Sequence, residues 1–566
     1  MFILTARSTE TSLQIAGSRM SEAVLLVILT VALYAAVWTI WPTLTAGSGG
    51  NDALFLADGA RRIALGQLPH RDFSLPTGVE PYLGYLAGGW LLPAAPAYIG
   101  AHLVGFLLIA PLVIAAGATF ERRIELWIFL LVVALAALFP FNTTQPNFYG
   151  ISFIASYNRL ASAFSIAALA WIFRSSETGG ACVKGVLLAY ALLFAFFLKI
   201  VLVGVALAPA LVLALCNPVW RRAVLIGAGL SIGALAGVEA ASGGLVSGYI
   251  ADIRAMSAIN SASAPYFFAS FIFRTFALQC VLAALIAWRL LDVVGEIRRS
   301  GAALTSRGAC AALSVPLAMA AAFAALVFSE SQGTEGLEFS SAAGLVFAPA
   351  LGGRRPGGLR MAVLVAAATL SAGALAINAF ENGTAVLLKR KGPAAPVVWV
   401  ERFLPHTAVP AAMLGRAEAT AAIWTQGAGL LKDLSGDGRD QINRSDVELY
   451  LAQWKIVDDA IRAIGTDAAS LGPVVTLANV DLFGLALGAE PAKGVKIVHD
   501  VGRTIAPLGF DQARAYLAGA RTVFAPTCAM AEAPGPELMS RWFAEALAAD
   551  FTPRRLNPCW TMHVRK

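Results

Sequence analysis

Residues 24–46 read VLLVILTVALYAAVWTIWPTLTA and contain no charged side chain. A helix needs about 20 mostly apolar residues to cross a bilayer, so this run predicts a membrane span. Arg7 and Arg19 precede the run, and its apolar part is longer than the apolar region of a cleaved signal peptide. We therefore expect it to remain in the protein as an N-terminal membrane anchor.

Similar apolar runs recur as far as residue 380 and give about eleven expected spans in total. After the first, they lie near residues 80–118, 124–141, 159–173, 185–198, 200–216, 223–243, 266–288, 310–328, 340–352 and 361–380. The stretch 185–216 is either two spans or a single long, tilted helix. The predicted fold class is therefore a polytopic α-helical membrane protein, with residues 1–380 as its transmembrane domain.

Composition and charge agree with a membrane protein. Charged residues make up 14% of the 566 residues, whereas a soluble domain carries about 25%. The formal net charge is +7, an excess that in membrane proteins usually marks cytoplasmic loops, so nucleic-acid binding is not expected. The Ala-, Leu- and Gly-rich, Lys-poor composition suggests a bacterium with a GC-rich genome, so the expected location is the bacterial inner membrane.

Basic residues set the expected orientation in that membrane. When 185–216 is counted as two spans, they gather after every second span: Arg122, Arg123, Arg174, Lys184, Arg221, Arg222, Arg289, Arg298, Arg299, Arg307, Arg354, Arg355 and Arg360. By the positive-inside rule that side, with the N-terminus, is cytoplasmic. The opposite loops 142–158, 244–265 and 329–339 are poor in Lys and Arg, but loop 47–80 is an exception. An odd number of spans places residues 381–566 outside the cytoplasm, in the periplasm.

Residues 381–566 differ from the rest of the chain because they lack a long apolar run. Short strands are predicted at 474–477, 494–499 and 522–525, and helices at 446–463 and 536–548. These elements predict a small C-terminal extracytoplasmic α/β domain. Cys528 and Cys559 are its only two cysteines, and an oxidising compartment favours a disulfide between them. Two free thiols in a cytoplasmic domain are the alternative.

The first expected external loop, residues 47–80, is rich in side chains that suit phosphate chemistry. Residues 52–65 have the spacing of an amphipathic helix, on which Ala53, Leu56 and Ala60 are expected to face lipid and Asp52 and Arg62 to face outward. Arginines at the mouth of a span can hold a phosphate, and a nearby acid can take a proton from a hydroxyl. An interfacial helix with snorkelling arginines is the alternative interpretation.

This loop resembles that of the GT-C membrane glycosyltransferases of the protein O-mannosyltransferase and aminoarabinose-transferase kind. The resemblance rests on Asp52 after the first span, on Gly66-x-x-Pro69-x-x-Asp72-Phe73, and on the proline-containing turn that enters the second span. It covers about 30 residues of local motif, and the many-span plan with an external C-terminal domain agrees with it. It implies that Asp52 is the catalytic acid of the loop and that the sugar donor is a polyprenyl phosphate.

The second expected external loop departs from the family pattern, because residues 142–158 contain no acid. No cofactor is therefore expected, and a divalent metal is not favoured. The candidate site comprises Asp52 as base, with Asp58 and Asp72 as second choices; Arg61, Arg62, Arg71, Arg159 and Lys199 for the donor phosphate; and His70, Tyr157, Asn158, Gln332, Glu335 and Glu338 for sugar or acceptor.

The expected function is inverting transfer of a sugar from a polyprenyl-phosphate donor to an extracytoplasmic glycan or lipid acceptor. Apolar surface between the spans would hold the lipid tail of the donor. Two alternatives from other classes remain open. One is a transporter or flippase of a lipid-linked saccharide, and the other is a non-catalytic partner in the assembly of an envelope polysaccharide.

Overall fold

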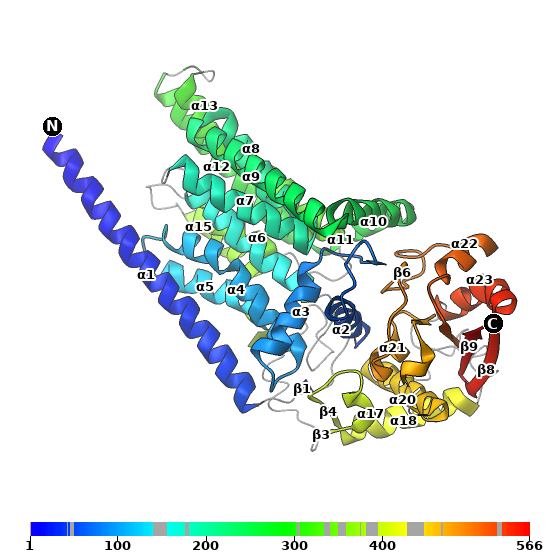
Figure 1. Ribbon diagram of the computed structural model, residues 1–566. Coiled ribbons are helices and arrows are strands. Elements are labelled where there is room, and N and C mark those ends of the chain that lie inside the picture. The colour runs from blue at the N-terminus through cyan, green and yellow to red at the C-terminus, as the bar shows by residue number, and fades with distance from the viewer. Residues whose placement is uncertain are drawn as a thin grey trace.

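The computed structural model describes residues 2–41, 44–45, 50–139, 156–175, 180–301, 303, 306–332, 340–348, 358–373, 375–377, 379–380, 394–426, 446–465, 468–528 and 535–566. Most of these residues are helical (Figure 1). The helices before residue 380 form a bundle, and the later segments form a smaller part with helices and short strands at one end of that bundle.

Six helices within these ranges are long and apolar enough to cross a membrane, judged by length and composition. They are residues 17–40 of α1 (Phe2–Ile40), α4 (Ala97–Gly117), α7 (Ala181–Leu198), α9 (Pro218–Ser242), α12 (Phe276–Arg299) and α13 (Arg307–Ser331). Several apolar helices of this length identify a multi-pass membrane protein. The larger number of eleven spans stays a prediction.

The other expected spans form shorter, broken or more polar helices. They correspond to α3 (Glu80–Leu91), α5 (Arg123–Leu138), α6 (Ser156–Arg174), α8 (Leu202–Cys216), α11 (Ala264–Arg274), α14 (Ala343–Val346) and α15 (Gly358–Ala368). The stretch 185–216 is two helices, because the backbone at Lys199 is extended (φ −159°, ψ 111°) between α7 and α8. The stretch 80–118 is likewise two helices, α3 and α4.

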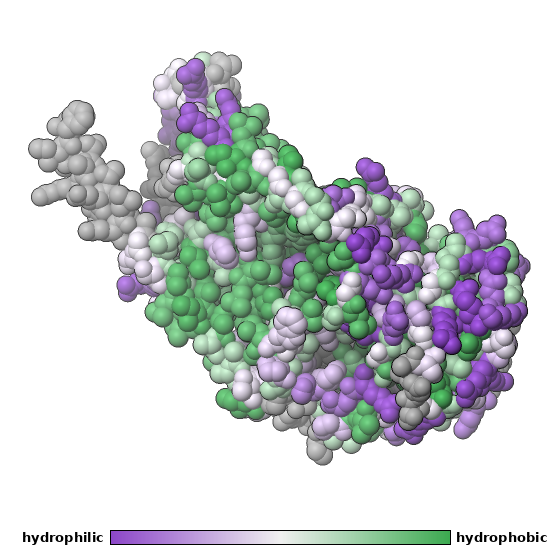
Figure 2. All heavy atoms as spheres, viewed as in Figure 1, coloured by the Kyte–Doolittle hydropathy of each residue, from purple (hydrophilic) through white to green (hydrophobic). Residues whose placement is uncertain are grey.

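Close helix packing explains where small residues lie in the bundle. α3 packs against α4 through Gly88 and Gly100; a Cβ on Gly88 would lie 2.3 Å from the backbone nitrogen of Ala101. α6 is buried along nearly its whole length, and α4, α5 and α8 pack around it. Large apolar side chains such as Leu33 (68% exposed) face outward instead. Figure 2 shows this apolar surface over the helical bundle, as expected for helices that contact lipid.

The C-terminal part contains a four-stranded sheet in the order β5-β7-β9-β8. The strands are β5 (Val474–Thr476), β7 (Thr522–Pro526), β8 (Phe551–Asn557) and β9 (Trp560–Arg565). β5 and β7 are parallel, while β9 is antiparallel to both β7 and β8. The expected strands near 474 and 522 are present, as are the expected helices, α20 (Asp446–Ile464) and α23 (Gly535–Asp550). The β8–β9 hairpin was not predicted.

Further elements complete this part of the chain. They are β3 (Ala394–Pro396), α17 (Val398–Glu401), β4 (Thr407–Pro410), α18 (Ala411–Gln426), α21 (Leu482–Leu487), β6 (Val495–Lys496) and α22 (Phe510–Tyr516). Phe483 of α21 stacks on Phe524 of β7 with ring centroids 3.9 Å apart, and Trp560 packs edge-on against Phe483. These rings fix α21 against the sheet, which matters because the segment around α21 contacts the first loop of the bundle.

Two short strands from the beginning of the chain pair with strands of the C-terminal part. β1 (Leu44–Thr45) is parallel to β4, and β2 (Phe73–Ser74) is parallel to β6. β6, expected at 494–499, therefore lies outside the four-stranded sheet. The segment between α1 and α3 is thus a structural connection between the two parts of the molecule.

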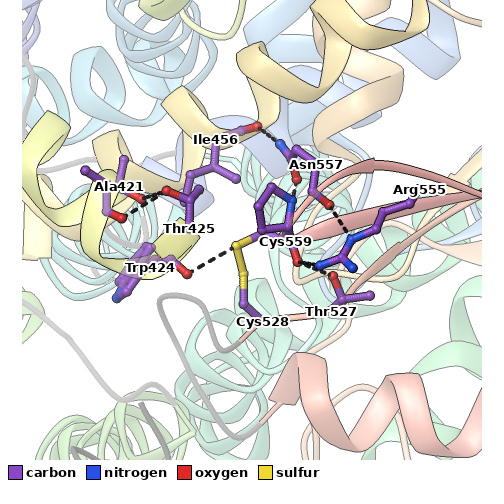
Figure 3. Close-up of a disulfide and its surroundings, with 11 residues drawn as sticks. Ala421, Trp424, Thr425, Ile456, Thr527, Cys528, Arg555, Asn557 and Cys559 are labelled. Carbon is purple, nitrogen blue, oxygen red and sulfur yellow. Dashed lines mark hydrogen bonds between the residues drawn. A yellow bond between two sulfur atoms is a disulfide. The ribbon is translucent and has the colours of Figure 1, made fainter. Parts of the chain in front are cut away.

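The structure pairs four of the six cysteines in two disulfides. Cys528, next to β7, is bonded to Cys559, next to β9, with their Cα atoms 4.8 Å apart (Figure 3). Thr527 and Asn557 hold this site, because the Thr527 N–H donates to the Cys559 carbonyl and the Cys559 N–H donates to Asn557 Oδ1. A second pair, Cys216 with Cys310, joins α8 to α13 and was not predicted.

Candidate functional site

The first loop folds around helix α2 (Gly50–Ala64), as the amphipathic pattern of residues 52–65 predicts. Figure 1 places α2 between the bundle and the C-terminal part, and α2 contacts both α3 and α21. The expected facing of α2 is wrong. Ala53, Leu56 and Ala60 are buried within the protein, and Arg62, expected to face outward, is 1% exposed. The reason is that α3 and the C-terminal helices α20 and α21 pack around α2, and Arg62 donates to the Ala492 carbonyl of the C-terminal part.

A buried cluster of charges joins α2 to the C-terminal part. The Asp58 carboxylate accepts hydrogen bonds from Arg61 Nη2 at 2.7 Å and from Arg62 Nε at 2.8 Å. Asp481, the N-cap residue of α21, lies 3.0 Å from Arg61 Nη2 and 3.6 Å from Arg62 Nη2. Two acids thus face two arginines. Burial, followed by the neighbouring Asp58 carboxylate, raises the pKa of Asp481, so Asp58 is the acid whose charge the arginines stabilise most.

The electrostatics of this cluster favour a structural role. Burial alone raises the pKa of Asp58, but Arg62 and Arg61 outweigh it and hold that pKa below its ordinary value. The arginines also donate to backbone carbonyls of the C-terminal part, Arg61 to Ala489 and Arg62 to Ala492 at 2.9 Å. Because these groups already bind one another, we do not assign Asp58 as a base or the two arginines as phosphate ligands.

The turn after α2 is held from two sides. Gln67 Nε2 donates to the Pro491 carbonyl at 2.7 Å, and the Gly494 N–H donates to the Asp72 carbonyl at 2.7 Å. The Asp72 side chain accepts the Leu68 N–H at 2.9 Å. Burial opposes ionisation of Asp72, but this N–H and the adjacent Arg71 hold its pKa below its ordinary value. Arg71 also donates to the Ser242 carbonyl at the end of α9. Both side chains therefore shape the turn.

Asp52 lies in the first turn of α2 in a different setting. It is half-buried and interacts electrostatically with the hydroxyls of Tyr82 in α3 and Tyr98 in α4. Phe55, one turn further along the helix, packs on the rings of Tyr82 and Tyr157, with centroids 6.1 Å and 6.4 Å apart. The acid that the resemblance singled out thus borders a group of tyrosines.

Two cations lie beside the same tyrosines. Arg159 in α6 is 5% exposed and donates to Tyr98 Oη at 3.2 Å and to the Phe139 carbonyl at 2.7 Å. Lys199, at the break between α7 and α8, donates to Asn158 Oδ1 at 3.1 Å. Tyr98 therefore interacts with both Asp52 and Arg159. Asn158, the residue before Arg159, is the hydrogen-bond partner of Lys199. We call Asp52, Tyr82, Tyr98, Tyr157, Asn158, Arg159 and Lys199 the tyrosine site.

Other candidates lie around this site or outside the described residues. Glu330, in the last turn of α13, and Arg503, from the C-terminal part, both interact electrostatically with Lys199. Gln332 follows Glu330 at the end of α13. Glu335 and Glu338 lie outside the described residues, as does most of loop 142–158. His70 pairs with Asp252 of α10 (Leu245–Asn260), Nδ1 to Oδ2 at 2.8 Å.

Sequence reasoning missed several members of this arrangement. Tyr82 follows the proline-containing turn of the first loop but had no assigned role, and Asp252 is the single acid of the expected loop 244–265, which is a usable signal. No sequence pattern pointed to Arg503, because it lies in a surface turn about 300 positions after Lys199 in the chain. Among the described residues, no three His, Cys, Asp or Glu side chains cluster as a metal site.

No family model, no curated protein and no solved structure matches this chain. The resemblance to the GT-C glycosyltransferases therefore stays a prediction.

Proposed function

We propose that the protein is a membrane glycosyltransferase that moves a sugar from a polyprenyl-phosphate donor to an extracytoplasmic acceptor. One observation carries this proposal. Tyr98 interacts with the carboxylate of Asp52 and accepts a hydrogen bond from the guanidinium of Arg159. A half-buried acid and a buried cation thus lie beside the same tyrosine hydroxyl, and transfer from a phosphate leaving group requires a base and a cation.

The proposed reaction needs few groups. Asp52 takes the proton of the attacking acceptor hydroxyl, whose oxygen forms a bond to the sugar C1. The C1–phosphate oxygen bond breaks on the opposite side, so the configuration at C1 inverts. The polyprenyl phosphate leaves as an anion, and Arg159 and Lys199 stabilise its charge. No metal ion takes part in this scheme.

The surroundings support a saccharide and a lipid as ligands. Tyr82, Tyr98 and Tyr157 gather aromatic rings and hydroxyl groups beside Asp52, a composition that suits a sugar ring, although Tyr82 and Tyr98 are buried in this structure. The apolar outer faces of the bundle suit the polyprenyl tail. The acceptor in this proposal is a glycan or a lipid of the cell envelope.

The proposal includes an orientation in the bacterial inner membrane. With eleven spans, the N-terminus is cytoplasmic, and the tyrosine site and the C-terminal domain are periplasmic. The Cys528–Cys559 disulfide agrees with an oxidising compartment on that side. The Cys216–Cys310 pair lies near Arg221, Arg222 and Arg307, at the end that the positive-inside rule assigns to the cytoplasm.

Thiol labelling of intact cells tests this orientation. We expect Cys528 and Cys559 to be blocked before reduction, and to react with a membrane-impermeant maleimide once a reductant is added. Cys216 and Cys310 should react only with a permeant reagent, because the cytoplasm keeps thiols reduced; we therefore expect the bond that joins them in the structure to be open in the cell. Mass spectrometry of the labelled peptides reads out both pairs. Free Cys528 and Cys559 that react only with the permeant reagent would contradict the orientation.

Turnover of a labelled donor tests the function. Purified protein in liposomes is given a radiolabelled polyprenyl-phosphate hexose together with a panel of envelope glycans and lipids. We expect label to move to an acceptor and free polyprenyl phosphate to appear. Movement of the intact donor across the bilayer without bond cleavage would identify a flippase instead. Neither event would favour a non-catalytic assembly partner.

A further inference from the structure

His70 and Asp252 form a buried pair that the proposed chemistry leaves unused. The two residues are 182 positions apart, yet His70 Nδ1 lies 2.8 Å from Asp252 Oδ2. The Leu75 N–H also donates to this oxygen, at 3.3 Å. A carboxylate oxygen that accepts from a backbone N–H is placed to accept from the imidazole as well, so the proton of His70 resides on Nδ1.

In the neutral imidazole, a proton on Nδ1 leaves Nε2 of His70 as a hydrogen-bond acceptor. The His70 side chain is 0% exposed, and Nε2 has no hydrogen-bond partner among the described residues. A buried acceptor without a donor is costly and uncommon in folded proteins. Such an atom is readily explained when a ligand supplies the missing donor.

The backbone holds the ring in a fixed position. His70 has a φ of 63°, in the left-handed region that non-glycine residues adopt at a cost. Its N–H donates to the Phe73 carbonyl at 2.8 Å, which closes the turn. Helix α10 lies against this turn at Gly248, where a Cβ would be 2.2 Å from the His70 carbonyl oxygen. A strained backbone conformation that neighbouring contacts hold in place is typical of functional positions.

The ring also borders the tyrosine site. It lies 4.5 Å from the ring of Tyr249, centroid to centroid. The Tyr249 hydroxyl accepts the N–H of Ile200, the residue after Lys199, and Tyr249 interacts electrostatically with Tyr82. Tyr82 in turn interacts with Asp52. Tyr249 therefore lies between His70 and the tyrosine site.

We propose that His70 Nε2 accepts a hydrogen bond from a saccharide hydroxyl and that Asp252 holds the imidazole in the tautomer that makes this possible. His70 is a positioning residue in this proposal, which rests on the proposed function, and Asp52 remains the base. A hydroxyl is the expected donor because a sugar ring supplies neutral O–H groups next to the reacting carbon. The hydroxyl belongs either to the donor sugar or to the acceptor.

The variant His70→Asn separates this role from a structural one. Asparagine tolerates the left-handed backbone, and its amide can donate to Asp252 as Nδ1 does, but it has no atom at the place of Nε2. We expect the thermal stability of His70→Asn to match that of the wild type. The KM for one substrate should rise about tenfold, the effect of one lost hydrogen bond, with a smaller change in kcat.

Asp252→Ala supplies the second arm, because it removes the oxygen that accepts the Nδ1 proton and leaves the imidazole free to take the other tautomer. It should raise the same KM by a similar factor, and the double variant should show no further rise. A rise in the donor KM assigns the hydroxyl to the donor sugar, and a rise in the acceptor KM assigns it to the acceptor. Normal KM values in His70→Asn, together with a defect in His70→Ala, would overturn the proposal and leave His70 a structural residue.

A binding measurement keeps this test independent of turnover. Titration calorimetry in detergent with the polyprenyl-phosphate hexose, and separately with the acceptor glycan, compares wild type with His70→Asn. A weaker affinity for one of the two probes supports the hydrogen bond even if no transfer occurs, in which case only the proposed function fails. Equal affinities in both proteins, or no binding of either probe to the wild type, would overturn the role of His70.

Discussion

Asp52 and Asp58 lie on the same helix, but their surroundings are opposite in kind. At about 100° per residue their side chains leave α2 about 120° apart. Asp58 is fully buried and receives two guanidinium groups, which in turn contact Asp481. Asp52 is half-buried beside the hydroxyls of Tyr82 and Tyr98. One helix thus presents a neutralised acid to the C-terminal part and a second acid to the tyrosine site.

The difference shows that charged residues of one motif can serve two roles, one in joining two parts of the chain and one in the proposed site. Arg61 and Arg62 have the composition of a phosphate site, yet their ion pairs and their bonds to the Ala489 and Ala492 carbonyls connect two parts of the chain. Arg159 and Lys199 donate instead to neutral oxygens of Tyr98, Phe139 and Asn158. These two cations are the better phosphate candidates because they lie beside Asp52 and the tyrosines, although Lys199 also interacts with the acid Glu330.

The largest effect is expected from Asp58→Asn. This change leaves Arg61 and Arg62 buried with one carboxylate in place of two, and breaking a buried ion pair typically costs about 3–5 kcal/mol. We expect the free energy of unfolding of the C-terminal part to fall by that amount, as measured by denaturant titration followed by tryptophan fluorescence. Asp52→Asn is the matched control and should change stability by less than about 1 kcal/mol. Equal losses in both variants would remove the distinction between the two acids.

The next effect concerns the cation beside the tyrosines. Arg159→Gln should lower kcat about a hundredfold, because a group that stabilises the departing anion is lost, while Arg159→Lys should retain part of the activity. Initial rates with saturating donor measure this, with circular dichroism to verify the fold. Arg61→Gln is the contrasting variant, which should lose stability first. A fully active Arg159→Gln enzyme would exclude Arg159 from phosphate binding.

Acid should destabilise the region around the buried charge cluster through His499. Burial lowers the pKa of His499 to about 4, below the ordinary value of about 6.5. His499 lies 2.7 Å from Tyr516 Oη and interacts with Asp58 and Arg62. The unfolded chain therefore takes up this proton first. The contribution of His499 to the free energy of unfolding is complete above pH 6.5 and decreases by about 3 kcal/mol as the pH falls toward 4.

Thermal unfolding between pH 7.5 and pH 4.5 measures this dependence. His499→Gln removes the titrating group and should flatten the profile over that range. The lowered pKa of Asp58 acts in the same direction at still lower pH, because its ionised form stabilises the fold. An unchanged slope in His499→Gln would mean that another group controls the response to acid.

The comparison also shows how much of the structure could be predicted from the sequence. Helix α2, the strands near 474 and 522 and the long apolar helices follow local periodicity, so the sequence was sufficient for them. The roles of Arg61 and Arg62 depend on Asp481, about 420 positions away, and no local pattern records that contact. The partner of His70 is equally remote.

Two further features could not be predicted from local sequence, for physical reasons. The apolar stretch 185–216 has one charged residue, Lys199, at its centre, and apolar periodicity alone could not decide between a break and a continuous helix. The sequence of β6 favours a strand, but it does not indicate which strand pairs with it. In the structure that partner is β2 of the first loop. Local sequence therefore predicted elements, whereas the division of charges between docking and site depended on tertiary contacts.

The most direct test of the account is a comparison of transfer rates in Asp52→Asn and Asp58→Asn. Both are measured with labelled polyprenyl-phosphate hexose at a temperature where each variant remains folded. We expect Asp52→Asn to bind donor with near-normal affinity and to lose at least about a thousandfold in kcat, because the base is gone while the shape of the side chain is kept. Folded Asp58→Asn should retain most of its kcat. Near-normal turnover by Asp52→Asn, or a selective loss of chemistry in folded Asp58→Asn, would contradict the assignment of Asp52 as the base.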